Sequence, residues 1–207
     1  MPGIRPFEQK DRSVFFGRDT DIEQLSRLIR LEKFVVLNGK SGLGKSSLLN
    51  AGVIPELERG GYAVEAIRLG AFDPKGIAEL NTPYHSLYTQ IQSESSYLAE
   101  VHPDDSLWMA AKHRQLRKES GRALVLVLDQ FEELFTWPPE AVSQFKRELA
   151  ALVNRKMPQA LSQTLQKLPQ DRFSEEQWEE IYRPLPIKVV MAIRADSGRG
   201  GAQAFSV

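Results

Sequence analysis

A phosphate-binding motif stands in the first quarter of the chain, with the sequence Gly39-Lys40-Ser41-Gly42-Leu43-Gly44-Lys45-Ser46. It fits G-x-x-x-x-G-K-[S/T], the pattern of the P-loop. Glycines let successive backbone N–H groups curl around an anion, and the following helix adds a partial positive charge at its N-terminus. Lys45 is expected to reach the β- and γ-phosphates of a nucleotide, and the hydroxyl of Ser46 to hold Mg²⁺. We include Ser47, the next residue, among the nucleotide-binding residues.

Carboxylates follow the most hydrophobic run of the sequence, Ala123–Leu128. Asp129 comes directly after it, in the arrangement called Walker B, and its carboxylate would hold the magnesium ion directly or through water. Glu132 and Glu133 come one short turn later, and one of them could orient the attacking water or accept its proton. We favour Glu132 and keep Glu133 as the alternative. A solvated acidic helix start is the other interpretation, and the P-loop upstream disfavours it.

Two arginines are further candidates. Arg194 directly follows the apolar run Ile187–Ile193, where its guanidinium could sense the γ-phosphate and stabilise charge as the bond breaks. A surface arginine after a strand is the simpler alternative, which we favour less. Arg18 lies in a Gly17-Arg18 turn that either approaches the base or phosphates of the nucleotide or forms only a local salt bridge.

Strands and helices that would position these residues can be placed from hydrophobic patterning and from the positions of Gly and Pro. Strands are expected near residues 34–37, 62–69, 123–128 and 187–193. Helices are expected near residues 19–31, 45–58, 83–98, 104–119 and 138–156, with two short ones within 157–185. This alternation predicts an α/β fold with a parallel sheet between helices and right-handed crossovers. Lys45, Asp129 and Arg194 all follow strand ends, so they should meet at one edge of the sheet, where such folds bind ligands.

Composition and missing motifs narrow the possible partners, cofactors and chemistry of the chain. The 207 residues include 27 Lys plus Arg and 27 Asp plus Glu, so the net charge gives no signal for a nucleic-acid partner. The absence of cysteine excludes disulfides and thiol chemistry. No run approaches the ~18 apolar residues of a membrane span, and no signal peptide is evident, so we expect no membrane partner and a cytoplasmic location. The guanine-reading motif Asn-Lys-x-Asp is missing, which favours ATP and ADP over guanine nucleotides.

Several segments together resemble the novel STAND family of signalling NTPases, relatives of the NACHT and AAA+ types. The resemblance spans about residues 4–196. The segments that carry it are Arg5-Pro6-Phe7, Phe15-Phe16-Gly17-Arg18, the P-loop with Ser47-Leu48 and Ala51-Gly52, Leu128-Asp129-Gln130-Phe131-Glu132-Glu133-Leu134-Phe135 and Ile193-Arg194-Ala195-Asp196.

The resemblance implies a P-loop NTPase of the additional-strand class, in which the fourth strand lies between the first and the third. Arg194 would then lie between the P-loop and Asp129 as a sensor arginine, and Gly17-Arg18 would lie near the nucleotide. Proteins of this family are ATP-driven switches that stay closed with ADP and self-associate when activated. Many serve bacterial signalling or defence, with sensor and effector regions that this sequence does not identify.

The family pattern continues through a fifth strand, a helical lid and a winged-helix domain, whereas this chain ends soon after the fourth strand. We therefore expect the NTPase portion alone, without fifth strand, lid, sensor or effector. We divide it into an N-terminal arm (residues 1–17), which we expect to be extended, a P-loop NTPase core (18–196) and a flexible tail (197–207). Two functions stay open: an ATP-hydrolysing switch domain with slow turnover, and a nucleotide-binding or protein-interaction module with little or no activity.

Overall fold

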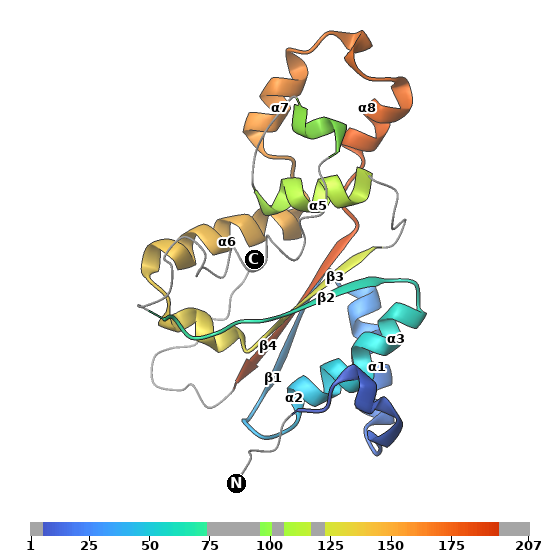
Figure 1. The fold of residues 1–207 in the computed structure, drawn as a ribbon, viewed down its shortest axis with the longest axis vertical. Helices are drawn as coiled ribbons and strands as arrows, with labels where there is room; N and C mark the ends of the chain where they lie inside the picture. Colours follow the sequence, from blue (N-terminus) through green and yellow to red (C-terminus); the bar gives the residue numbers. More distant parts are fainter. Residues whose placement is uncertain (1–5, 74–95, 101–105, 117–122, 195–207) are drawn as a thin grey trace. The chain divides into compact units, whose positions relative to one another are not determined.

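The computed structural model describes residues 6–73, 96–100, 106–116 and 123–194 (Figure 1). The chain forms two compact units, of which the first comprises Met1–Ala71, Leu124–Thr136 and Lys188–Val207, and the second Phe72–Ala123 and Trp137–Ile187. Most of the helix predicted over residues 83–98, and the whole of the predicted tail 197–207, lie outside the described residues.

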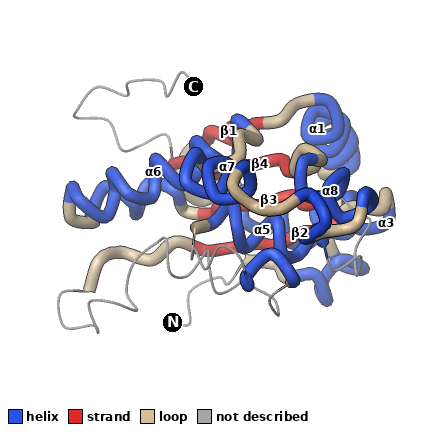
Figure 2. The backbone as a smooth tube through the Cα atoms, turned by 90° about the horizontal axis from the view of Figure 1, so that it is seen from above, coloured by secondary structure: helices blue, strands red, loops and turns tan. Residues whose placement is uncertain are grey.

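A four-stranded sheet runs through the first unit in the order β1-β4-β3-β2. Its strands, drawn in red in Figure 2, are β1 (Phe34–Gly39), β2 (Ala63–Arg68), β3 (Leu124–Asp129) and β4 (Ile187–Arg194). β1 pairs parallel to β4, and β2 parallel to β3. All four predicted strands are confirmed, and the fourth lies between the first and the third, as the resemblance implied. The apolar residues of β3 are at most 7 % exposed, which explains why this strand shows no polar alternation.

The helices of the first unit confirm two predictions. They are α1 (Asp19–Leu31), α2 (Lys45–Ser47) and α3 (Ile54–Arg59). The helix expected over residues 45–58 is interrupted by a π-helical turn, Leu48–Val53. Pro55 accounts for the interruption, because it has no N–H to donate to the carbonyl four residues earlier and its ring would crowd that carbonyl.

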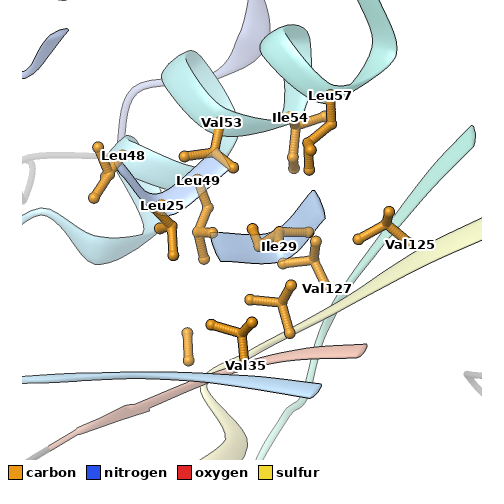
Figure 3. Packing of buried hydrophobic residues seen from close by; sticks show 12 residues of the cluster. Leu25, Ile29, Val35, Leu48, Leu49, Val53, Ile54, Leu57, Val125 and Val127 are labelled. Carbon is orange, nitrogen blue, oxygen red and sulfur yellow. The ribbon is translucent and has the colours of Figure 1, made fainter. Parts of the chain in front are cut away.

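Apolar side chains from α1 and from the helix after the P-loop pack on one face of the sheet (Figure 3). Ile29 and Leu49 are 1 % exposed and Leu57 is fully buried. They meet strand residues such as Val35 and Val127. Burying such side chains contributes about 1.5–3 kcal/mol each, so this packing fixes the helix that follows the P-loop against the strand that precedes it.

The N-terminal arm, expected to be extended, contains a short 3-10 helix, Gln9–Val14. Glu8 and Asp11 form a reciprocal capping box at its start, which satisfies backbone N–H groups that have no partner within the helix. Phe7 precedes this helix in the sequence and Phe15 follows it, and the centroids of their rings lie 5.5 Å apart.

The second unit is helical where it is described. Its helices are α5 (Leu107–Leu116), α6 (Pro139–Asn154), α7 (Gln159–Gln166) and α8 (Glu175–Tyr182), with 3-10 turns at Tyr97–Glu100 and Gln170–Arg172. α5 packs against α6 and α8. α6 and the two short helices α7 and α8 confirm the prediction for residues 138–185. A capping box between Ser174 and Gln177 begins α8.

A buried lysine joins α5 to α8. Lys112 has no exposed surface. Its ammonium donates to the carbonyls of Glu180 and Arg183, at 2.8 and 2.7 Å, and to Oε1 of Gln115 at 2.8 Å. The side chain therefore satisfies backbone acceptors at the C-terminal end of α8 that the helix itself leaves unpaired. Burial lowers the pKa of Lys112 from 10.5 to about 8.

We expect the stability of the chain to rise as the pH increases from about 8 to about 10.5. In that window the folded protein has lost the Lys112 proton while the unfolded chain still binds it, so unfolding takes up a proton and becomes less favourable as the pH rises. Urea unfolding of the wild type and of Lys112→Met at several pH values measures this. The rise should be present only in the wild type; identical pH profiles would contradict the assignment.

Candidate functional site

The P-loop connects β1 to α2 in the first unit (Figure 1). Gly42 and Gly44 have φ values of +80° and +72°, in the left-handed region that glycine adopts without strain. Gly44 is also the residue from which the helix begins, and its carbonyl accepts the N–H of Leu48 at 2.8 Å. The backbone conformation of the loop therefore favours glycine at positions 42 and 44.

Lys45 folds back over its own loop. Its Nζ donates to the carbonyl oxygens of Gly39, at 2.5 Å, and Lys40, at 3.0 Å. A Cβ atom at position 39 would lie 3.5 Å from Cδ of Lys45, an ordinary van der Waals contact, so the lysine stem passes directly beside Gly39. The ammonium is held at the loop by carbonyl groups, which are weaker partners for it than an anion would be.

A cavity of about 500 Å³ opens beside the loop within the first unit. It is formed by four segments: the P-loop, the acidic segment after β3, the end of β4 and the N-terminal arm. The lining residues are Pro6, Phe7, Phe15, Ser41, Gly42, Gly44, Lys45, Ser46, Ser47, Asp129, Gln130, Glu132, Glu133, Ala192 and Arg194. Ten of the residues singled out in the sequence are among them; Gly39, Lys40, Leu43 and Arg18 are not.

The acidic segment begins where β3 ends. Asp129 is the last residue of β3, and the 3-10 helix Phe131–Thr136 that follows it carries Glu132 and Glu133. Phe131 and Leu134 of this short helix are buried, which anchors it. The three carboxylate residues therefore line the cavity together with the P-loop. They come from a distant part of the sequence but lie at the same edge of the sheet.

Arg194 is the last residue of β4 and is aligned with Gly39 at the end of β1. Because β4 lies between β1 and β3, Arg194 stands between the strand that leads into the P-loop and the strand that ends at Asp129. Its backbone N–H donates to Oε2 of Glu132 at 3.1 Å. This contact ties the acidic segment to the end of β4 and holds one carboxylate oxygen of Glu132.

Arg18 contacts the P-loop from outside the cavity. It forms an ion pair with Asp21 and donates from Nη1 to the carbonyl of Leu43 at 3.3 Å. Of the two possibilities left open for the Gly17-Arg18 turn, the structure contains the local salt bridge, together with a contact to the phosphate-binding loop.

Sequence reasoning missed five lining residues. The backbone N–H of Phe7 donates to Oγ of Ser47 at 3.0 Å, which ties the N-terminal arm to the residue after the P-loop motif. Pro6, Phe15 and Ala192 add apolar surface, and Gln130 adds an amide. The only sequence signal for them was the aromatic residues of the arm, of which Phe7 and Phe15 contact each other while Phe16 is 78 % exposed.

The model of the family described as Novel STAND NTPase 1 matches residues 1–200. The chain belongs to this family. A comparison with curated proteins found no match. Family membership supports nucleotide binding by a P-loop NTPase fold, and every segment of the cavity lies within the matched residues. Among the residues that the structure describes, no helix is long and apolar enough to cross a bilayer.

Proposed function

We propose that the chain is an ATP-binding and ATP-hydrolysing switch domain. The observation that carries this proposal is that the P-loop, Asp129, the two glutamates and Arg194 line a single cavity. These groups come from separate segments of the sequence and have the chemistry that phosphoryl transfer to water requires: donors for phosphate, oxygen ligands for a cation, a carboxylate base and a guanidinium.

The P-loop and Lys45 would bind the phosphates of the nucleotide. Backbone N–H groups around Gly42 and Gly44 would surround the phosphates, and the ammonium of Lys45 would exchange its carbonyl partners for phosphate oxygens, which bind it more strongly. Phe7 and Phe15, on the arm, offer apolar surface for the base or ribose. Arg18 would support the loop through Leu43 and contact the nucleotide only if the loop rearranges.

The residues present fit a magnesium ion bound together with a nucleotide. Ser46 and Asp129 supply a hydroxyl and a carboxylate to one cavity, and Mg²⁺ takes such oxygen ligands along with substrate phosphates and water. Within the described residues there is no cluster of three or more His, Asp or Glu side chains that could hold a metal without a nucleotide. Ser46 and Asp129 would hold the magnesium ion, which would supply positive charge to offset that of the nucleotide phosphates.

For hydrolysis, we assign the role of general base to Glu132 and keep Glu133 as the alternative. The water oxygen forms a bond to the γ-phosphorus, the bond from that phosphorus to the bridging oxygen breaks, and the water proton passes to the carboxylate. Arg194 N–H donates to Oε2 of Glu132, so Oε1 is the oxygen that we expect to accept the proton. The guanidinium of Arg194 would stabilise the charge that develops on the phosphoryl group.

The proposal predicts different outcomes for the two glutamates. Glu132→Gln should lower phosphate release from MgATP by a factor of about 100 or more, since a positioned base contributes roughly that much. Its affinity for ATP should be unchanged, because the substitution keeps the shape of the side chain. Glu133→Gln should keep turnover within about threefold of the wild type. Steady-state phosphate release and nucleotide titration of both variants measure this, and the opposite ranking would transfer the role to Glu133.

A module that binds nucleotide with little turnover is the second candidate. The contact between Glu132 and the backbone of Arg194 favours it, since a carboxylate held by the sheet is less able to move toward a water molecule. Saturable ATP binding without measurable phosphate release, in the wild type as in Glu132→Gln, would decide for this function. Self-association on activation, and control by sensor and effector regions, are further parts of the proposed switch function.

A further inference from the structure

Gln130, the residue after Asp129, has a left-handed backbone conformation with φ of 56°. Among the described non-glycine residues, only Arg155 shares this feature. A residue with a Cβ atom pays for this conformation, and such residues tend to occur at functional sites. Gln130 also lines the cavity beside the P-loop, whereas Arg155 ends helix α6 in the second unit.

The backbone of Gln130 connects the carboxylates of the site. Its N–H donates to Oδ1 of Asp129 at 3.0 Å, so one oxygen of that carboxylate has a fixed direction. Its carbonyl accepts the N–H of Glu133 at 3.0 Å, which closes the first turn of the 3-10 helix. The turn at Gln130 therefore sets both the orientation of Asp129 and the direction in which the two glutamates leave the sheet.

The side chain of Gln130 is held by the neighbouring strand. Nε of Arg68 donates to Oε1 of Gln130 at 2.6 Å. Arg68 is the last residue of β2 and is aligned with Asp129 in the parallel pair β2–β3. The N–H of Leu69 then donates to the carbonyl of Asp129 at 3.0 Å, which extends the ladder past the strand end. Arg68 is thus fixed beside Asp129 by the sheet and is placed to hold the side chain of Gln130.

We propose that Gln130, anchored by Arg68, is a positioning residue that orients the Asp129 carboxylate for a magnesium–nucleotide complex. This proposal rests on the proposed function of the cavity and assigns a part to Gln130 and Arg68, neither of which is among the candidate site residues predicted from the sequence. The charged hydrogen bond from Arg68 holds the Gln130 turn, and the Gln130 N–H holds the carboxylate. Loss of the anchor should loosen the metal ligand without changing the phosphate-binding loop.

The variants Gln130→Ala and Arg68→Ala test the anchor from both sides. Partners that orient a metal ligand contribute about 10- to 100-fold to metal affinity. We expect the lower end of this range, because the anchor acts through an exposed hydrogen bond. In each variant, half-maximal enhancement of ATP binding should therefore require about a tenfold higher Mg²⁺ concentration. ATP affinity in EDTA should equal that of the wild type. The double variant should be no worse than either single variant, because both remove the same contact.

Two further variants separate orientation from folding. Gln130→Gly removes the cost of the left-handed backbone as well as the side chain, so it should not lower the melting temperature and should still raise the Mg²⁺ midpoint. Arg27→Ala, on the exposed face of α1, is the matched arginine control and should change neither quantity. Wild-type Mg²⁺ midpoints in both Arg68→Ala and Gln130→Ala would overturn this inference alone. Absence of ATP binding by the wild type would overturn the proposed function, and this inference with it.

Discussion

Lys45→Ala is expected to weaken ATP binding by a factor of at least about 100, since hydrogen bonds to charged groups contribute about 1.5–3 kcal/mol each and 1.4 kcal/mol corresponds to tenfold. The lysine is the charged donor of the phosphate loop, and its ammonium already lies at the loop, bound to the carbonyls of Gly39 and Lys40. Alanine would remove the donor and leave those carbonyls facing the phosphates.

A titration with a fluorescent ATP analogue measures this loss. Lys33→Ala removes a lysine at the start of β1, outside the cavity, and should bind ATP like the wild type. The melting temperature of Lys45→Ala without nucleotide should stay close to the wild-type value, because its lost contacts are partly exposed. An affinity of Lys45→Ala within threefold of the wild type, given wild-type binding, would show that ATP binds elsewhere.

Gly52→Ala is expected to destabilise the chain by about 1–3 kcal/mol, the range typical of overfilled, well-packed sites. A Cβ atom at position 52 would lie 2.6 Å from Cγ1 and 2.7 Å from Cδ1 of Ile22, so α1 or the π-helical turn would have to move. Phe15 of the arm lies 3.7 Å from the same point. The sign of the stability change separates crowding from helix propensity, because alanine in place of glycine in an open helix stabilises it by about 1 kcal/mol.

Chemical denaturation of two controls supports the interpretation of Gly52→Ala. Gly70→Ala meets nothing within 4 Å and should leave the free energy of unfolding nearly unchanged. Ile22→Ala opens the space that the new methyl group needs, so the double variant should lose less stability than the sum of the single variants. An unchanged or raised free energy of unfolding for Gly52→Ala would contradict the packing described here.

The four strands and the residues of the P-loop motif could be predicted because each depends on local sequence signals. The positions of Lys45, Asp129 and Arg194 after strand ends predicted that they meet at one edge of the sheet. β3 is a continuous apolar run, and its burial on both faces required that composition. The glycines of the P-loop predicted a tightly curled backbone, and the structure shows positive φ values at Gly42 and Gly44. The position of β4 between β1 and β3 came from the family resemblance, since hydrophobic patterning gives strands but no strand order.

Contacts between distant segments lay beyond sequence reasoning. Nothing in the local sequence pairs Arg68 with Gln130, or the N–H of Arg194 with Glu132, because each contact depends on how the strand ends align. The arm was expected to be extended, yet it forms a 3-10 helix and brings Phe7 to Ser47. The π-helical turn after the P-loop depends on Pro55, and helix periodicity alone does not show where such a turn lies.

The most direct test of the central claim is calorimetric titration of the wild-type chain with ATP and with ADP, with and without Mg²⁺. The account predicts saturable binding of one nucleotide per chain, in the micromolar range typical of about 8 kcal/mol of binding free energy, and tighter ATP binding when Mg²⁺ is present. No saturable binding of either nucleotide, by a chain whose unfolding is cooperative under the same conditions, would contradict the claim that this cavity is a nucleotide site.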